Sequence, residues 1–311
     1  MLGRPGPSLA RREAAAHLVA AARESADPAS WEETGRTLFA DPDADVRRAG
    51  TALLALAGGP PDALRERLGP ALADPSAVVR LEAVGQLADV GSQELRPALA
   101  AALADAAFLV RFEAARGLAA LRHPAGLDVL VEALDQGALR FRAIGALAQL
   151  ADLRAVAPLQ RLFRRWLLDP FDKTQTAGAL ALLGDPDGRA HLLARLEARH
   201  ALDRPLAVEL CGEAKVRDAE EALLALLGDA ADPARGAAAR ALGRLGSERA
   251  SPRLEQLLTD ASAPEEARLD AAEGLVFLRG ASAREALAAA LPAFAAEESR
   301  AELRALLEEL R

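Results

Sequence analysis

The chain is poor in cysteine, aromatic residues and long apolar runs, and each shortage excludes a class of protein. Its one cysteine, Cys211, permits neither an internal disulfide nor a zinc site built on several cysteines. Aromatic residues make up 3% of the chain, tyrosine is absent and β-branched residues are scarce, which disfavours strands. No run approaches the roughly 18 apolar residues of a membrane span, and the start lacks the apolar stretch of a secretory signal. We therefore expect a helical, soluble protein of the reducing cytoplasm.

Lysine is also scarce, and acidic residues outnumber basic ones. Lys173 and Lys215 are the only lysines among 38 basic residues, and the formal net charge is −8. Nucleic acids and anionic membranes both attract proteins with a basic surface. The charge therefore disfavours nucleic-acid partners and argues against a membrane-bound protein.

What the chain does have is an internal repeat within an apolar fraction of 51% that is mostly alanine and leucine. Residues 74–87 and 105–118 share one frame, in which an aspartate precedes an arginine and a leucine follows that arginine by seven positions. The basic residue of this frame recurs at intervals of 29 to 33 residues, at Arg47, Arg80, Arg111, Arg140, Lys173, Arg204, Arg235 and Arg268. The position seven residues later is leucine in every repeat except one, where it is Cys211.

The frame is typical of the start and buried face of an α-helix. Aspartate, followed in several repeats by proline, is suited to the first turn, because its carboxylate can accept from unpaired amides and proline fixes a helical φ. Counted from the basic residue, apolar residues fall at −1, +3, +7 and +10, for example Val79, Ala83, Leu87 and Val90. These positions form one stripe of a helix.

A second helix precedes each of these segments, for example over residues 62–72, 127–134 and 156–167. Helix pairs that recur about every 31 residues make an α-solenoid. We predict an all-α solenoid of about nine helix–turn–helix repeats. An N-terminal capping helix would occupy residues 1–28 and the solenoid residues 29–311, with its last repeat, about 281–311, as the C-terminal cap.

The Asp-Pro, Val-Arg, Ala and Leu pattern resembles HEAT repeats, in particular the bacterial HEAT-like subgroup named after the phycobilin lyases. The resemblance covers roughly residues 30–311, with departures at Asp172 and Asp203, where valine is expected. It implies a stack of helix pairs and, because most HEAT proteins are scaffolds or adaptors, a binding function. A few members are enzymes.

No catalytic constellation emerges from the sequence. The four histidines (His17, His123, His191 and His200) are scattered, and none is followed by glutamate, so a resemblance to the iron-dependent deoxyhypusine hydroxylases fails. Phosphate-binding loops of the Gly-x-x-x-x-Gly-Lys type and nucleophile elbows of the Gly-x-Ser-x-Gly type are absent from the sequence. Cys211 stands at a core leucine position, and we interpret it as a buried apolar residue. We expect no catalytic residue, metal or cofactor.

The recurring basic residue has two interpretations. It could form a row of binding groups, or it could pair with aspartate or backbone groups of the neighbouring repeat. In HEAT-like repeats the second role is common, and we favour it.

Position +1 is the first candidate for partner binding. On a helical wheel it lies almost opposite the stripe, yet consecutive repeats place Leu81, Phe112 and Phe141 there. These side chains could line a groove on the concave face that binds a helix or extended segment. Arg116 and Arg142 could then fix the orientation of the bound segment. Alternatively, they fill gaps between adjacent repeats.

The second candidate is the densest basic and aromatic cluster, which contains Arg161, Arg164, Arg165 and Trp166. Residues 111–173 carry ten basic and seven acidic residues, so this part is basic within an acidic chain. The cluster could bind an acidic partner segment. Alternatively, it is a solvated helix face with Trp166 in the core.

These observations favour a non-catalytic scaffold or adaptor that binds a protein segment in its concave groove. Two alternatives follow from the family resemblance. One is a phycobilin-lyase-like subunit that handles a tetrapyrrole. The other is a HEAT-like DNA glycosylase, which the net charge of −8 disfavours.

Overall fold

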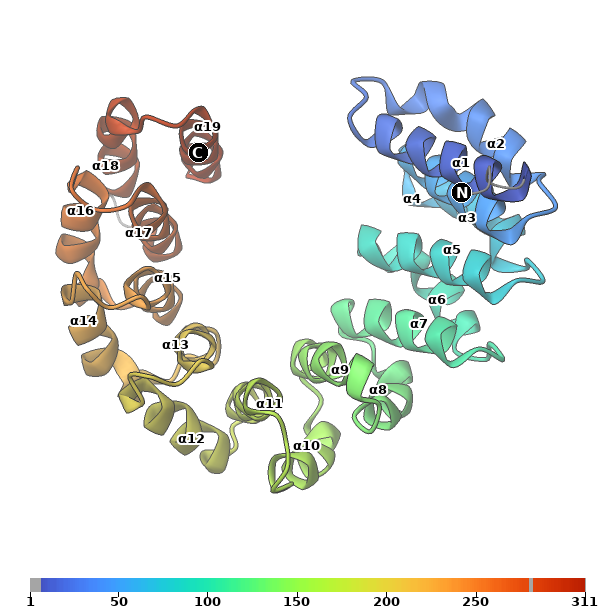
Figure 1. Cartoon of the computed structure of the whole chain (residues 1–311). Helices are drawn as coiled ribbons and strands as arrows, with labels where there is room; N and C mark the ends of the chain where they lie inside the picture. Colours follow the sequence, from blue (N-terminus) through green and yellow to red (C-terminus); the bar gives the residue numbers. More distant parts are fainter. Residues whose placement is uncertain (1–6, 280–281, 311) are drawn as a thin grey trace, which may run out of the picture. The chain divides into compact units, whose positions relative to one another are not determined.

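A computed structural model describes residues 7–279 and 282–310, and within these ranges the chain is helical and contains no strand. The contacts divide the chain into two units, Met1–Asp152 and Leu153–Arg311, which we describe separately. In both units the α-helices form successive pairs (Figure 1). We call the earlier member of each pair its first helix and the later member its second helix.

Unit 1 contains four such pairs, preceded by α1 (Pro7–Arg23). Its first helices are α2 (Glu32–Phe39), α4 (Pro61–Leu72), α6 (Arg96–Ala102) and α8 (Leu127–Ala133). Its second helices are α3 (Ala44–Leu56), α5 (Ala77–Val90), α7 (Phe108–Ala120) and α9 (Gly137–Leu150). Short 3-10 helices lead into three of the first helices, namely η1 (Pro28–Trp31), η2 (Gln93–Leu95) and η3 (Pro124–Gly126).

Unit 2 contains five pairs. Its first helices are α10 (Val156–Phe163), α12 (Pro186–Glu197), α14 (Glu220–Gly228), α16 (Ser251–Thr259) and α18 (Ala283–Ala290). Its second helices are α11 (Pro170–Leu182), α13 (Arg204–Glu213), α15 (Arg235–Leu245), α17 (Glu265–Leu278) and α19 (Glu297–Glu309). The 3-10 helices are η4 (Leu153–Ala155), η5 (Arg217–Ala219), η6 (Glu248–Ala250) and η7 (Leu291–Ala293). The described part of the chain thus holds nine pairs, which confirms the predicted solenoid of about nine repeats.

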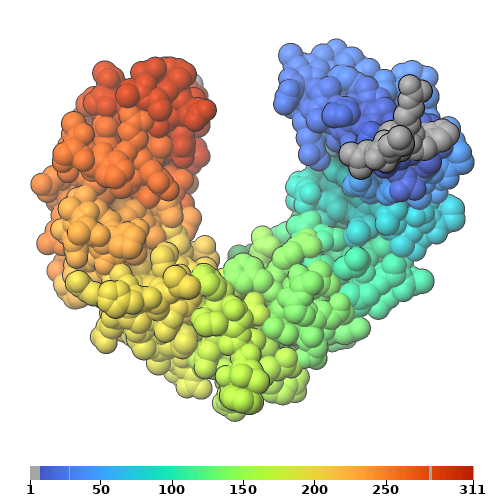
Figure 2. All heavy atoms as spheres, in the orientation of Figure 1, coloured from blue at the N-terminus to red at the C-terminus, as the bar shows by residue number. Residues whose placement is uncertain are grey.

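The repeat register accounts for the core. Positions −1, +3 and +7 are buried in α5, where they are Val79, Ala83 and Leu87, and in α7. Position +10 is less consistent, because Val90 is exposed at the end of α5 whereas Leu150 is buried at the end of α9. Within each unit, side chains close the spaces between neighbouring helices (Figure 2).

Position +4 is an additional core position that the sequence pattern did not single out. It is fully or almost fully buried in the second helices from α3 to α17, for example at Val84 of α5 and Ile144 of α9. A second helix contacts both its own first helix and neighbouring second helices in its unit, as α5 contacts α4, α3 and α7. In unit 2 the contact between α15 and α17 is especially close, because a Cβ added to Gly243 would lie 2.3 Å from the Gly274 carbonyl oxygen.

Helix α1 packs on α3 at the start of unit 1 and buries Ala15. Ser8 Oγ donates to Asp43 Oδ2 at 2.6 Å, and Arg12 Nε donates to the same oxygen at 2.8 Å. A capping role for residues 1–28 stays a prediction, and its first six residues lie outside the described part of the chain. Residues 281 and 311, the bounds of the predicted C-terminal cap, also lie outside it.

One helix end differs from the sequence prediction. The apolar pattern predicts a helix over 156–167, but α10 ends at Phe163. The chain needs residues 164–169 to turn back toward α11, where the Asp169 side chain accepts hydrogen bonds from the amides of Phe171 and Asp172. Trp166 consequently lies in a loop.

Candidate functional site

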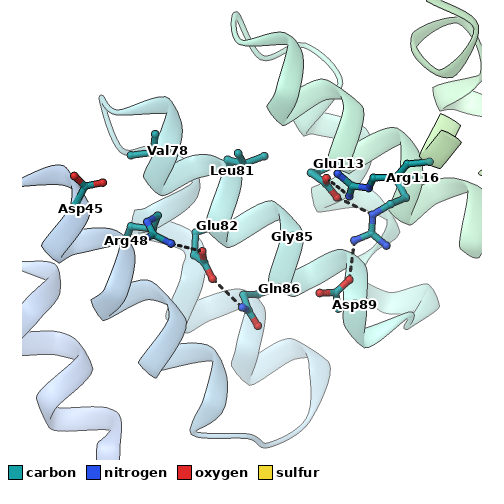
Figure 3. Close-up of a pocket in the computed structure, with 11 residues that line it drawn as sticks. Asp45, Arg48, Val78, Leu81, Glu82, Gly85, Gln86, Asp89, Glu113 and Arg116 are labelled. Atoms are coloured by element: carbon teal, nitrogen blue, oxygen red, sulfur yellow. Dashed lines mark hydrogen bonds and ion pairs between the residues drawn. The ribbon is translucent and has the colours of Figure 1, made fainter. Parts of the chain in front are cut away.

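A hollow on the exposed face of the second helices in unit 1 is the candidate site, because it brings apolar and charged side chains of four successive second helices together. It has a volume of about 400 Å³, and Figure 3 shows most of its lining side chains. Helices α3, α5, α7 and α9 contribute these residues, which are Asp45, Arg48, Val78, Leu81, Glu82, Gly85, Gln86, Asp89, Glu113, Arg116 and Arg142. We refer to this feature as the α5 hollow.

The floor of the α5 hollow is partly apolar. Val78 and Leu81 lie one helical turn apart on α5 and are exposed and half-buried, respectively. Gly85 follows after another turn, and a Cβ added there would meet nothing within 4 Å. The helix thus leaves space at this point for a side chain that the chain itself does not supply.

The rim of the α5 hollow consists of charged groups that are already paired. Arg116 donates to Glu113 and to Asp89, each at 2.7 Å, and so links α7 with α5. Arg142, on α9, donates to the other oxygen of Glu113. Although burial opposes it, hydrogen bonding to Glu113 and Asp89 raises the pKa of Arg116 above its ordinary value. A ligand would therefore meet a surface of balanced, oriented charges.

The predicted row of apolar anchors at position +1 is wrong in one member. Phe112 is 0% exposed and lies beneath the Arg142 guanidinium, whose central carbon is 5.2 Å from the ring centroid. Phe141 is 45% exposed but does not line the α5 hollow, and Leu81 does line it. Because α9 and its Arg142 cover the flank of α7, Phe112 belongs to the contact between repeats. The gap-filling alternative therefore describes Phe112.

A second hollow adjoins the first at α3. It has a volume of about 490 Å³ and shares Asp45, Arg48 and Glu82 with the α5 hollow. Its remaining lining comes from α1 and α3 and includes Val19 and Ala49. The two hollows together follow the second-helix face from α1 to α9.

The other predicted cluster lies in unit 2, so the predicted partner-binding residues do not form one site within a single unit. Arg161, Arg164, Arg165 and Trp166 are all exposed, and Trp166 is 88% exposed. The alternative that places Trp166 in the core is therefore wrong. Trp166 is exposed because α10 ends early, at Phe163, and the side chain therefore lies on the outside of the following turn.

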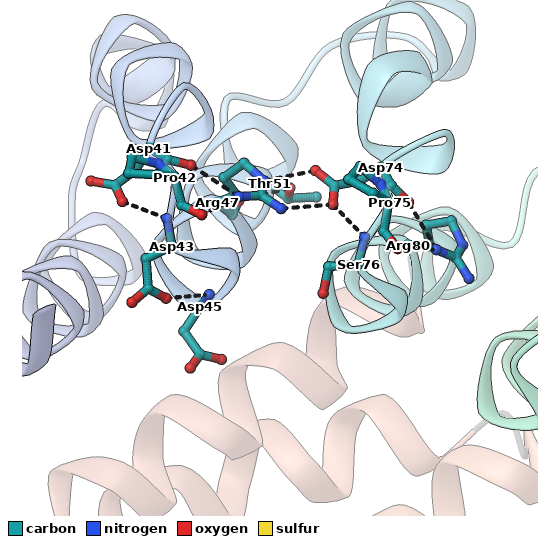
Figure 4. Close-up of polar contacts among 10 residues, drawn as sticks. All are labelled: Asp41, Pro42, Asp43, Asp45, Arg47, Thr51, Asp74, Pro75, Ser76 and Arg80. Carbon is teal, nitrogen blue, oxygen red and sulfur yellow. Dashed lines mark hydrogen bonds and ion pairs between the residues drawn. The ribbon is translucent and has the colours of Figure 1, made fainter.

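The recurring arginine connects successive repeats, as Figure 4 shows for the first of them. Arg47 donates to both carboxylate oxygens of Asp74, at 2.8 and 3.0 Å, and also to the carbonyl of Pro42 at 2.9 Å. Arg80 binds Asp105 in the same way, at 2.7 and 2.9 Å.

Farther along the chain, in unit 2, Arg204 contacts both oxygens of Asp232, at 3.0 and 2.8 Å. Arg47, Arg80 and Arg204 therefore join neighbouring repeats, in line with the favoured interpretation. The carboxylate does more than open a helix, because it also accepts from the preceding repeat. Arg111 and Arg235 donate to backbone carbonyls of their own repeat.

A buried polar cluster in unit 2 contains the histidine with the most interactions. Thr174 donates to Asp203 at 2.6 Å and lies 3.2 Å from His191 Nε2, and Arg195 also binds Asp203. Burial, together with the nearby Lys173 and Arg195 cations, lowers the pKa of His191. Thr174 is fully buried, so its hydroxyl cannot reach a substrate. The arrangement satisfies the carboxylate that replaces valine in the repeat.

Two further features bear on chemistry. Cys211 is fully buried at its leucine position, and burial raises the pKa of its thiol to about 12. Among the described residues, no group of three or more histidine, cysteine, aspartate and glutamate side chains could hold a metal ion. Within the same residues, no helix has the length and apolar character needed to cross a membrane.

Comparisons with solved structures found several helical-repeat proteins. The complex of CpcE and CpcF of phycocyanin lyase from Nostoc is 18% identical, with a TM-score of 0.46, and the match covers 90% of this chain and 94% of that one. Human deoxyhypusine hydroxylase is 21% identical, with a TM-score of 0.35 and coverage of 91% and 96%. A structure of Kap95p with RanGDP is 13% identical, with a TM-score of 0.41 and coverage of 89% and 45%.

Comparison with sequence families gives a more direct assignment. No curated protein matches the chain. The model of the PBS lyase HEAT-like repeat matches residues 139–165. The model of HEAT repeats matches residues 65–138 and 189–276, which together make up more than half of the chain. The chain therefore belongs to the HEAT-repeat family.

Proposed function

We propose that this chain is a cytoplasmic, non-catalytic scaffold that holds a segment of a partner protein against the second-helix face of unit 1. The α5 hollow carries the proposal. It combines exposed apolar side chains, an open position above Gly85 and a rim of oriented charges. A stack of helix pairs offers such a surface over several repeats, which suits an extended or helical segment.

The charges of the hollow indicate what kind of segment would fit. Four acidic residues (Asp45, Glu82, Asp89 and Glu113) and three arginines (Arg48, Arg116 and Arg142) line it. Because the arginines are already paired with these carboxylates, a purely acidic segment would have to displace them. A segment of mixed charge with one apolar anchor, placed over Leu81 and Gly85, matches the surface without breaking those pairs.

Filling the hollow provides the sharpest test. Gly85→Leu places a side chain in open space on a helix, and replacing a helical glycine contributes up to about 1 kcal/mol of stability. We expect this variant to fold at least as well as the wild type and to lose the partner. The measurement is a pull-down from native cell extract, with mass spectrometry of the captured proteins and thermal unfolding of each variant.

Gly137→Leu is the matched control. Gly137 lies at the start of α9 in the same unit, also with nothing within 4 Å of an added Cβ, and it does not line the hollow. This variant should capture the same proteins as the wild type. If Gly85→Leu also captures them undiminished, the α5 hollow is not the binding site.

A second candidate function rests on the match to the PBS lyase HEAT-like repeat at residues 139–165. In that case the chain would be a subunit that handles a tetrapyrrole. Mixing purified protein with a free bilin and recording visible absorbance tests it directly. A shifted, saturable absorbance band supports this function, and an unchanged bilin spectrum argues against it.

A further inference from the structure

The loop between α10 and α11, residues 164–169, exposes more apolar surface than a short turn requires. Trp166 is 88% exposed and its neighbour Leu167 is 75% exposed. Phe171, at the start of α11, is 42% exposed. Large apolar side chains that lie next to one another in solvent are typical of surfaces that bind a partner.

Both ends of this loop are held by hydrogen bonds. The amide of Arg164 donates to the Gln160 carbonyl at 3.1 Å, and the amide of Arg165 donates to Leu162 at 3.0 Å. At the other end the Asp169 carboxylate accepts from the Phe171 amide at 2.8 Å. The chain thus presents Trp166 and Leu167 outward from anchored ends.

Three arginines precede this apolar tip within five positions of Trp166 in the sequence. Arg161 is on the last turn of α10, Arg164 and Arg165 begin the loop, and all three are exposed. Arg164 forms a long ion pair, with its Nη2 atom 4.0 Å from Asp187 Oδ2. Arginine binds carboxylates through two parallel hydrogen bonds, so this group favours an acidic ligand.

We propose that the α10–α11 loop is a second docking site, which binds a short acidic protein segment carrying an apolar side chain. Carboxylates of the segment bind Arg161, Arg164 and Arg165, while its apolar side chain packs on Trp166 and Leu167. An anionic bilayer would also attract the arginines, but the net charge of −8 would repel the rest of the chain from it. The site belongs to unit 2 and shares no residue with the α5 hollow.

Tryptophan fluorescence tests this proposal, because Trp31 and Trp166 are the only tryptophans. In a Trp31→Phe variant, Trp166 alone reports on the loop. The probe is a synthetic peptide of repeated Glu-Glu-Leu triplets, and a Lys-Lys-Leu peptide of equal length is its control. We expect a saturable blue shift with the acidic peptide only, and the shift should weaken as salt is added.

Charge-matched variants identify the arginines involved. R161Q/R164Q/R165Q should raise the Kd of the acidic peptide about tenfold, since three exposed charge pairs are lost. R65Q/R217Q/R284Q removes three exposed arginines elsewhere and should leave the Kd unchanged. Circular dichroism should show the same helix content for both triple variants.

Three outcomes would overturn the proposal. The acidic peptide could leave Trp166 emission unchanged, the basic peptide could bind equally well, or vesicles of phosphatidylserine and phosphatidylcholine could bind in place of the peptide. The Gly85→Leu variant should bind the acidic peptide as the wild type does. A loss of peptide binding in that variant would assign the peptide to the α5 hollow and so contradict a second site. The pull-down with Gly85→Leu therefore tests the α5 hollow independently of the peptide experiment, which tests the α10–α11 loop.

Discussion

Phe112 and Phe141 occupy equivalent positions in neighbouring repeats but differ in burial, at 0% and 45% exposed. We expect Phe112→Ala to cost about 3–5 kcal/mol of unfolding free energy, because it leaves a cavity between α7 and α9. Phe141→Ala removes a partly solvated ring and should cost less than about 1 kcal/mol. Urea unfolding of each variant gives both values, and equal shifts would contradict the different burial of the two rings.

Substitutions of the leucines at position +7 should have more similar effects on the free energy of unfolding. Leu118 and Leu147 are both fully buried in the second helices of unit 1. Each substitution to alanine is expected to cost about 2–5 kcal/mol, the usual range for large-to-small changes in a core. An unfolding midpoint that does not change in either variant would show that the repeat register is wrong.

A helical wheel predicted the core residues better than the exposed ones. It treats one helix alone, and it placed position +1 opposite a stripe drawn through −1, +3, +7 and +10. Burial of +4, as at Val84 and Ile144, moves the centre of the buried arc toward +1. Position +1 therefore lies on a flank that the next repeat covers to different extents. Arg116, which the sequence suggested as a partner-binding residue, lines the hollow together with Glu82 and Gly85 at positions +2 and +5. The wheel of one helix does not show that these residues of α5 and α7 lie around the same hollow.

At the scale of elements, paired arginine and aspartate residues connect neighbouring repeats at Arg47–Asp74 and Arg80–Asp105 in unit 1 and at Arg204–Asp232 in unit 2. Hydrogen bonds from Arg47 and Arg80 lower the pKa values of Asp74 and Asp105, respectively, below their ordinary value of 3.8. A carboxyl group with a lowered pKa in the folded state stabilises the fold above its unfolded pKa, and this contribution is lost as the pH falls. We expect this contribution of the two aspartates to be constant near neutral pH and to be lost progressively as the pH falls below 3.8, as measured by urea unfolding across that range.

Asp105→Asn isolates this effect. The amide oxygen can still accept from the Ala107 amide, as Asp105 does at 2.8 Å, but the charge that binds Arg80 is gone. At neutral pH we expect a loss of about 2 kcal/mol, on the scale of a partly buried charged hydrogen bond. Between pH 4 and 2 this variant should lose less stability than the wild type, because one linked proton is removed. An identical acid response in both proteins would argue against the linkage.

The positions of the helices were largely predictable, because the repeat contains residues typical of a helix core and, in some repeats, of a helix end. The leucine seven residues after each basic residue fixes the second helix, and a glycine fixes some helix ends, as at Gly91 and Gly246, whose φ values are +65° and +77°. The end of α10 could not be predicted, because residues 164–167 continue an apolar and basic helical pattern. It is the return of the chain toward α11 that ends the helix there. The exposure of Trp166 depends on that turn.

At the scale of the whole molecule, each repeat within a unit contacts mainly its neighbours in sequence. In a stack of this kind, stability is close to a sum of repeat and neighbour terms. Leu118→Ala in unit 1 should therefore increase amide hydrogen exchange in α5, α7 and α9, with little change in α15 and α17 of unit 2. Mass spectrometry of peptic fragments measures this, and a uniform increase along the chain would indicate one fully cooperative fold instead.

The architecture follows from the sequence because its period, its leucine positions and its helix-start residues all specify the same helix pairs. The partner does not follow, because binding depends on the few surface positions at which repeats differ. Leu81 is an example, because its apolar side chain at position +1 marked it as a candidate, whereas the repeat pattern gave no reason to select Val78. The HEAT-repeat assignment likewise describes what the repeats share.

The lone thiol of Cys211 has a practical consequence. It belongs to the buried core of unit 2, on α13, which contacts α15, and its pKa is raised to about 12, so the closed state protects it from alkylating and disulfide reagents. The rate at which a thiol reagent labels it therefore reports how often unit 2 opens, without an engineered probe. Labelling should be faster in Leu242→Ala, and its rate should be unchanged in Leu118→Ala.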